Sequence, residues 1–423
     1  MDDQHSDGTK PDGDQPLPPR PDHLSPIADG VEFLYRPSDL LLTHESAAQL
    51  GPILREDYKA HPYEPGVGWR SAHSEHTVNV HRRLDAAGLG LELWHVPTPN
   101  RHTLPEIVSR FRASDDDRAP AISLNHVLVG EPKYQGGPGG EPHAADDPGS
   151  PWGARVVGQG LRVDLAVLDT GLPADLGQLH KDLVACAFMD PTDVDECDDD
   201  HDGLLDSQAG HGAFICGLVH LVAPGLGIDP GRVLDSTGIG DDLSIALELA
   251  ETMAPVINLS LGGYTQDDTA PLALSAAIAA LGHARAVVAA AGNNASDRPF
   301  WPAALKGVFA VAAYDSAEKA PATFSNFGPW VDVCAPGVNL RSAFPTGIRL
   351  DRVTEVTEHF SGWARWSGTS FAAPLFAAEV ARRRAQTTGR TPRQTALELL
   401  SELPESSWPG FGAYYEPPVD PTM

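Results

Sequence analysis

The sequence contains few basic side chains and no long hydrophobic segment. Its 423 residues include 58 acidic and 30 basic side chains, which gives a formal net charge of −28. Phosphate binding requires clustered Lys and Arg, so we expect no nucleic acid partner. The negative charge disfavours anionic membrane surfaces, and no apolar run approaches the roughly 20 residues that span a bilayer. We therefore expect no membrane association.

The amino terminus also lacks the features of a secretory signal. It reads MDDQHSDGTKPDGDQPLPPRPD, with no basic segment followed by an apolar one. We therefore expect a cytoplasmic protein, with export by a signal-independent route left open. Cysteine is scarce, and its spacing forms no C-x-x-C pair and no zinc pattern. Free thiols are expected at Cys186, Cys197, Cys216 and Cys334.

The length favours one large domain and one smaller domain. Stretches rich in Gly, Pro and Asp divide the chain into segments. We expect a disordered tail at 1–25, a small α+β domain at 26–130, a Gly/Pro linker at 131–153, a large domain at 154–400 and an irregular tail at 401–423.

The smaller domain alternates strand and helix patterns between Val31 and Gly130. EFLYR and DLLLT predict a strand region, and GLELWHV and AISLNHVLV predict two further strands. ESAAQLGPILRED and TLPEIVSRFRA have helical spacing. The order strand, helix, strand, helix, strand predicts a small α+β unit of ferredoxin-like type.

From Val156 onward, short apolar runs alternate with helical patterns. RVDLAVLD, PVINLSLGG and AVVAAAGNN predict buried parallel strands, RVLDSTGIGDD predicts a strand ending in a loop, and HGAFICGLVHLVAP and LSIALELAETM predict helices. We expect an α/β fold with a doubly wound, mostly parallel sheet and helices on both faces. Ligands bind such sheets at the carboxyl ends of strands, where Asp169, Ser260 and Asn293 stand.

Three polar residues each have a structural and a catalytic interpretation. Asp169 can cap a turn, or it can orient a histidine. His211 begins an apolar helix, where it can be structural or can act as a base between a carboxylate and a hydroxyl. Asn293 can form a turn, or its amide can donate to an oxyanion. His220 lies nine residues from His211, so the two do not form a metal pair on one helical face.

The stretch WSGTSFAAP raises the same question for a hydroxyl group. Ser370 stands where Gly368 and Thr369 lead into an alanine-rich helix. Its side chain can cap that helix. It can also be a nucleophile, because the unpaired N–H groups of a helix start can hold an oxyanion.

These residues occur in the order Asp, His, Asn, Ser, each in a glycine-bearing loop. The order and the flanking sequences resemble the subtilisin-like serine peptidases, the subtilases of peptidase family S8. The matching stretches are VLDTGL, GHGAFICG, NLSLGG, AAAGNN and SGTSFAAP. GTSFAAP is the most specific of them, and FSNFG and APG also fit the pattern.

The resemblance implies a serine endopeptidase that hydrolyses peptide bonds. Ser370 would attack the scissile carbonyl, and His211 would take its proton and pass it to the leaving amine. Asp169 would fix the imidazole tautomer. Asn293 and the Ser370 N–H would hold the oxyanion.

The resemblance also implies how a peptide or protein substrate binds. An extended strand at 260–263 would pair with the substrate backbone. The substrate-binding residues implied are Ser260, Leu261, Gly262 and Gly292. Two departures from the family pattern stand out: Ala213 and Phe214 replace the usual Thr-His pair, and the pocket-shaping segment 293–308 is short. They predict altered packing near the cleft and leave the side-chain preference open.

An acidic stretch, DPTDVDECDDDHDGLLD at 190–206, precedes His211. Asp198, Asp200 and Asp202 alternate as in the first half of a calcium loop, and Asp206 takes its ninth position. The twelfth position is Ala209 instead of Glu, so the pattern is incomplete. A structural calcium that the chemistry does not require, a solvated acidic loop and a preference for basic substrate side chains are all open interpretations.

The resemblance suggests a role for the smaller domain. Many family members carry a ferredoxin-like prosegment that lays its last strand in the cleft, and ISLNHVLVGEP fits such a strand. This domain would then be an intramolecular inhibitor, with a cut site in the linker, and an unrelated accessory domain is the alternative. For the whole chain, the alternatives are a catalytically silent peptide-binding module and a dedicated precursor-processing peptidase.

Overall fold

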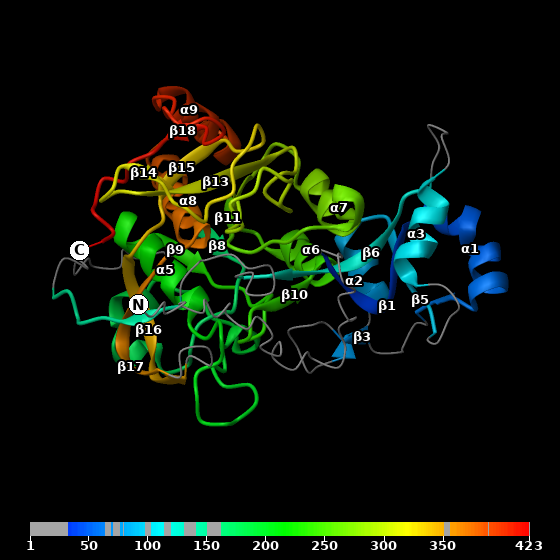
Figure 1. Cartoon of the computed structure of the whole chain (residues 1–423), viewed down its shortest axis with the longest axis horizontal. Coiled ribbons are helices and arrows are strands. Elements are labelled where there is room, and N and C mark those ends of the chain that lie inside the picture. The colour runs from blue at the N-terminus through cyan, green and yellow to red at the C-terminus, as the bar shows by residue number, and fades with distance from the viewer. Residues whose placement is uncertain are drawn as a thin grey trace, which may run out of the picture.

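The computed structural model describes residues 33–63, 69–70, 77–78, 80–97, 103–113, 120–130, 141–149, 162–350, 356–387 and 389–422. A smaller α+β unit, built from the segments between 33 and 130, lies beside a larger unit that begins at 162 (Figure 1). The predicted tail at 1–25 and most of the predicted linker lie outside the described residues.

The larger unit is built around a mostly parallel sheet, which confirms the predicted α/β fold. Its strand order is β18-β15-β13-β12-β11-β8-β9, with β14 antiparallel to β13. The strands are β8 (Val163–Val167), β9 (Gly227–Asp229), β11 (Val256–Leu259), β12 (Ala286–Ala290), β13 (Val308–Asp315), β14 (Ala320–Pro321), β15 (Val333–Pro336) and β18 (Ala413–Tyr414).

Helices cover both faces of this sheet because its strands are apolar on both faces. In β8, Leu165 and Val167 belong to the same apolar cluster as α5 (His211–Val222) and α8 (Thr369–Gln386). Ala166 and Leu168 face the other way, toward α6 (Asp242–Glu251) and α7 (Leu272–Leu281).

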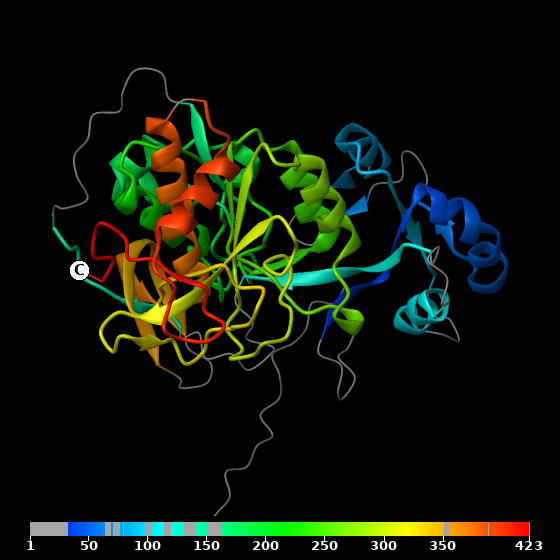
Figure 2. The ribbon, with the colours of Figure 1, turned by 90° about the horizontal axis from the view of Figure 1, so that it is seen from above.

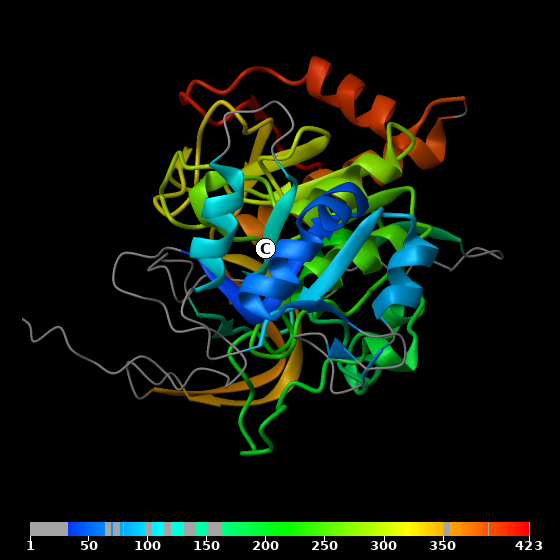
Figure 3. The same ribbon diagram turned by 90° about the vertical axis from the view of Figure 1, so that its right-hand side faces the viewer.

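The smaller unit contains an antiparallel sheet with the order β10-β6-β1-β5-β2. α1 and α3 pack on its outer face, nearest the viewer in Figure 3. Its elements are β1 (Leu34–Thr43), α1 (His44–Tyr58), β2 (His61–Pro62), α2 (Val80–Ala87), β5 (Leu91–His95), α3 (Leu104–Arg112) and β6 (Ile122–Val129). The predicted strands and helices are therefore present, and the assignment to the ferredoxin-like type stays a prediction.

One strand joins the two units. β10 (Ile239–Asp241) belongs to the larger unit, yet it pairs antiparallel with β6 of the smaller one. β6 therefore extends from the smaller unit into the larger one (Figure 2). On α2, Arg83 forms ion pairs with Glu248 and Glu251 of α6, at 2.6 and 2.9 Å.

Three segments differ from their predicted structure. The strand predicted at the start of RVLDSTGIGDD is reduced to an isolated bridge between Asp169 and Arg232, because the following residues turn away to pair with β6. The predicted linker contains β7 (His143–Ala144), which pairs with β17 (Thr357–Trp366). The predicted irregular tail contributes β18 and two buried rings, Phe411 and Tyr415. Two-residue strands depend on a neighbouring edge, so they leave no periodic pattern in the sequence.

The remaining described elements lie around these layers. They are β3 (Trp69–Arg70), β4 (Thr77–Val78), η2 (Leu176–Gln178), α4 (Lys181–Val184), η3 (Pro191–Asp193), η4 (Gln266–Asp268), β16 (Leu340–Leu350), β17 (Thr357–Trp366) and α9 (Pro392–Glu402). No helix of the described residues is long and apolar enough to cross a membrane. The four cysteines are buried free thiols, as predicted.

Candidate active site

Asp169 and His211 form a buried pair at the carboxyl end of β8. Asp169 stands two residues after this strand, and His211 is the first residue of α5. The Asp169 Oδ1 atom lies 2.7 Å from His211 Nδ1, and both side chains are fully buried. Thr170 N also donates to Asp169 Oδ1, at 2.9 Å. With Asp169 ionised, Nδ1 carries the ring proton and Nε2 presents a lone pair.

The imidazole ring of His211 is held by aromatic neighbours. Its centroid lies 5.3 Å from the rings of both Trp366 and Phe371. Phe214, in the position where the family pattern has histidine, packs on Phe371 at 4.6 Å. The Nε2 atom is buried and has no hydrogen-bond partner among the described residues. The ring is therefore fixed by packing and by Asp169, with its second nitrogen available to another group.

Ser370 is the second residue of α8, and it is not a cap. Gly368 is the N-cap residue and makes no side-chain capping bond. Pro374 lacks the N–H that would bond the Ser370 carbonyl in a regular helix. Ser260 Oγ donates to that carbonyl instead, at 2.6 Å. The start of α8 is thus tied to the strand end at Ser260.

The Ser370 hydroxyl lies among backbone carbonyls. Its Oγ lies 3.3 Å from the carbonyl oxygens of both Ser260 and Gly130, either of which can accept its one proton. Gly130 also lies beside the histidine, because a Cβ built on it would be 3.7 Å from His211 Cε1. The hydroxyl and the imidazole therefore border the same point of the cleft.

The side chain of Asn293 has a fixed orientation. Its Oδ1 accepts hydrogen bonds from Thr369 N at 2.9 Å and from Thr369 Oγ1 at 2.8 Å. Thr369 Oγ1 in turn accepts from Gly292 N at 3.0 Å. With the amide oxygen engaged twice, the NH₂ group of Asn293 is the one available to donate beside Ser370.

Among the other predicted substrate-binding residues, Gly262 pairs with the end of β6. Val129 and Gly262 exchange both backbone hydrogen bonds, at 2.9 Å each. Gly130 N donates to Gly238 O at 2.9 Å. The Leu261 side chain points into the apolar core instead of the cleft. The end of β6 therefore lies as an extended strand between β10 and the segment at 260–262.

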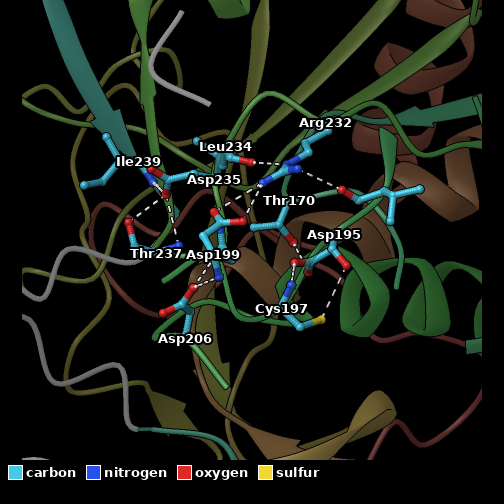
Figure 4. Close-up of polar contacts among 12 residues, drawn as sticks. Thr170, Asp195, Cys197, Asp199, Asp206, Arg232, Leu234, Asp235, Thr237 and Ile239 are labelled. Atoms are coloured by element: carbon cyan, nitrogen blue, oxygen red, sulfur yellow. Dashed lines mark hydrogen bonds and ion pairs between the residues drawn. The ribbon is translucent and has the colours of Figure 1, made fainter. Parts of the chain in front are cut away.

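The buried carboxylate of Asp195 contacts the neighbours of both Asp169 and His211, and Figure 4 shows its contacts with Thr170 and Cys197. Asp195 Oδ2 accepts from Thr170 Oγ1 at 3.0 Å and from Gly210 N at 2.8 Å. Asp195 Oδ1 accepts from Cys197 N at 3.0 Å, and Thr170 Oγ1 accepts from Gly212 N at 3.0 Å. Burial raises the pKa of Asp195 to about 6, although these hydrogen bonds oppose the shift.

The predicted calcium ligands do not all lie together. The carboxylates of Asp198, Asp200 and Asp202 have oxygen atoms within 4.8 Å of one another. Asp206 is directed elsewhere and accepts from Ser236 Oγ and Asp199 N, at 2.5 and 2.8 Å. Calcium takes six to eight oxygen ligands, so three carboxylates supply part of a coordination shell. The calcium site stays a prediction, with Asp206 outside the group.

Four residues of this region were not identified from the sequence. Gly130, Phe300, Thr369 and Asp195 contact the predicted residues or hold them in place. Thr369 lies within the GTSFAAP stretch and Gly130 follows the predicted strand ISLNHVLV, so both residues could have been identified from the sequence. Asp195 carries no separate signal, because it is one of many acidic residues in its segment.

Comparisons with known proteins show the family to which the chain is related. A model of the subtilase family matches residues 160–403, which is 244 of the 423 residues. The "Thermophilic serine proteinase" of Bacillus sp. (strain AK1) is 34% identical over 261 residues, covering 60% of this chain and 59% of that protein. Thermitase of Thermoactinomyces vulgaris is 31% identical over 231 residues, covering 52% of this chain and 73% of that protein.

A solved cold adapted subtilisin-like serine proteinase is 24% identical, with a TM-score of 0.45 over 62% of this chain and 93% of that one. The chain spans about three fifths of the length of the Bacillus relative. The family match covers more than half of the chain. This chain therefore belongs to the subtilase family.

Proposed function

We propose that this protein is a serine endopeptidase whose catalytic residues are Asp169, His211, Asn293 and Ser370. The observation that carries the proposal is the buried 2.7 Å Asp169–His211 pair next to the Ser370 hydroxyl. Its relatives are named serine proteinases, which supports the same chemistry. A cytoplasmic location remains part of the proposal.

In the first step, Ser370 Oγ forms a bond to the scissile carbonyl carbon. The hydroxyl proton moves to His211 Nε2, and Asp169 stabilises the resulting imidazolium. The carbonyl oxygen becomes an oxyanion, which accepts from the Asn293 NH₂ and the Ser370 N–H. The C–N bond then breaks, and His211 gives its proton to the leaving amine.

Water completes the reaction on the acyl-enzyme. His211 Nε2 takes a proton from water, and the hydroxide oxygen bonds to the acyl carbon. The bond to Ser370 Oγ breaks, the proton returns to that oxygen, and the acid product leaves. The same NH₂ and N–H groups stabilise the second oxyanion, so one arrangement serves both steps.

The smaller unit is proposed to restrain this activity as an intramolecular inhibitor. Val129 and Gly130 take the backbone hydrogen bonds that a substrate strand would take. The Gly130 carbonyl can also accept from the proposed nucleophile. A peptide or protein substrate must therefore displace the end of β6.

The test is the intact mass of the full chain before and after reaction with a small fluorophosphonate. We expect one adduct on the wild type and on Val129→Pro, faster on the latter, and none on Ser370→Ala. No adduct on a folded Val129→Pro chain would reject the enzyme and favour the silent peptide-binding module. A labelled chain that ignores casein and cuts one cellular partner would favour a dedicated processing peptidase.

A further inference from the structure

The ring of Phe300 fills the space between two glycines that border the cleft. A Cβ built on Gly262 would lie 2.2 Å from Phe300 Cε1, and one built on Gly292 would lie 2.9 Å from Phe300 Cγ. Real side chains do not approach so closely, so both positions need glycine while the ring is there. Gly292 also has a φ of +97°, which side chains rarely adopt. The ring therefore lies against both backbones at once.

These two glycines flank the position of the bond to be cut. Val129 pairs with Gly262 in antiparallel register. Two residues further along a strand in this register, a substrate residue lies opposite Ser260, beside Ser370 and Asn293. Ser370 Oγ lies 3.3 Å from the Ser260 carbonyl, so we infer that the substrate residue opposite Ser260 carries the carbonyl that Ser370 attacks. We call it the acyl residue.

The direction of its side chain follows from strand geometry. Successive side chains of an extended strand point to opposite sides. A Cβ on Gly130 would point toward Leu234 Cδ1 at 3.2 Å and His211 Cε1 at 3.7 Å. The acyl residue comes next, so its side chain points away from the histidine. That direction leads to the side of the cleft where Gly262, Gly292 and Phe300 meet.

The Phe300 ring is not free to move aside. It is buried, and its centroid lies 5.4 Å from the ring of Tyr264 in an edge-to-face arrangement. The next residue, Trp301, exchanges both backbone hydrogen bonds with Gly263, at 2.9 Å each. Moving the ring would disturb this pairing and the close packing around it.

We propose that Phe300 restricts the peptidase to substrates whose acyl residue is small: glycine, alanine or serine. This inference rests on the proposed function and specifies its substrate class. The ring takes the volume that a larger side chain would need, so substrates with Phe, Leu or Met in that position are excluded. The peptidase discriminates between substrates because the space that the Phe300 ring fills cannot widen without loss of packing.

The test uses the residues that follow Gly130 in the chain as a substrate for the same chain. Two chains carry Pro132→Ser together with either Glu131→Ala or Glu131→Phe, so that they differ only in the acyl residue. Each is made with Phe300 in place and with Phe300→Gly. The rate of self-cleavage after position 131 is followed by intact mass, with Ser370→Ala as the blank.

The matched control for the loss of an aromatic ring is Phe309→Ala. It removes a buried ring that packs on Phe376 at a centroid distance of 6.3 Å, away from the cleft. General loosening of the larger unit should affect both variants. A change in the ratio of the two self-cleavage rates in Phe300→Gly alone therefore assigns the discrimination to the ring at position 300.

With Phe300 present, we expect the Glu131→Ala chain to be cut at least tenfold faster than the Glu131→Phe chain. Phe300→Gly should abolish or reverse this ratio, and Phe309→Ala should leave it unchanged. Equal cutting of both chains with Phe300 in place overturns the inference. The inference is also overturned if neither chain is cut although the Val129→Pro variant is labelled by the fluorophosphonate. Absence of labelling instead rejects the proposed function itself.

Discussion

The hydroxyl of Ser370 and the carbonyl of Gly130 lie 3.3 Å apart, although the two residues are 240 positions apart in the chain. This contact covers the proposed nucleophile with the end of β6. Because the covering strand belongs to the same chain, its effective concentration is in roughly the millimolar range or above. Small changes in the docking of β6 should therefore change activity more than changes elsewhere in the smaller unit.

Val129→Pro should release the cleft. Val129 N donates to Gly262 O at 2.9 Å, and proline has no N–H to donate. We expect labelling by the fluorophosphonate and casein cleavage to rise at least fivefold over wild type. Val129→Ala keeps the N–H and should change either rate by less than twofold. Equal rates in the proline variant and the wild type would contradict inhibition by β6.

Thr369→Val should impair catalysis by releasing the Asn293 amide. The substitution keeps the shape of the side chain but removes the hydroxyl that bonds Asn293 Oδ1 and Gly292 N. We expect kcat to fall about tenfold, against the 10²–10³-fold loss typical when an oxyanion donor is removed by Asn293→Ala. Thr369→Ser retains the hydroxyl and should keep most of the activity.

A double variant separates this effect from general damage. If Thr369 acts by orienting Asn293, Thr369→Val should cost little more in a chain that already carries Asn293→Ala. Measuring kcat with one peptide substrate for the wild type, the two single variants and the double variant gives the coupling free energy between Thr369 and Asn293. Independent, additive losses would count against the orienting role.

The sequence predicted the larger unit well because its strands are buried on both faces. Residues 165–168 and Ala286–Ala290 appear in the sequence as continuous apolar runs, each followed by a glycine-bearing loop with a polar residue. Those loops meet at one edge of the sheet, so the order along the chain was enough to bring Asp169 and Asn293 to one region.

Contacts that depend on a partner far along the chain were not predictable. The resemblance suggested that ISLNHVLVGEP lies in the cleft, but β10, which is three residues long and about a hundred positions later, was not indicated as its partner. Phe300 looks like any core aromatic until Gly262 and Gly292 are placed on both sides of it. Asp206 takes the ninth position of a calcium pattern, but Ser236 holds it away from the other carboxylates.

Calcium should raise the melting temperature of the full chain if the predicted site forms. Three carboxylates within 4.8 Å repel one another, and a hard cation would relieve that repulsion. We expect Asp200→Asn to reduce the calcium-dependent shift. Asp206→Asn should leave it unchanged, because Asp206 lies outside the group. A melting temperature that does not respond to millimolar calcium at low salt would favour a solvated acidic loop.

Asp195 should make activity depend on pH by holding Thr170 and Gly210 in place. Its carboxylate accepts all three of its hydrogen bonds only when ionised. The pKa of about 6 implies protonation below that pH. An amide at position 195 would present NH₂ to groups that are themselves donors. We therefore expect Asp195→Asn to lower kcat/KM at least tenfold at pH 8, with the difference shrinking toward pH 5 as the wild type itself becomes protonated.

Stability should change in the opposite direction. The pKa is raised from 3.8 in the unfolded chain, so the native state binds more protons between about pH 4 and 6, and this group's contribution to stability falls as pH rises through that range. The melting temperature of Asp195→Asn relative to wild type should therefore increase with pH and level off above about 6. Asp198→Asn, a more exposed substitution in the same segment, should show neither trend. A constant activity ratio from pH 5 to 8 would show that Asp195 does not position the Asp169–His211 pair through its charge.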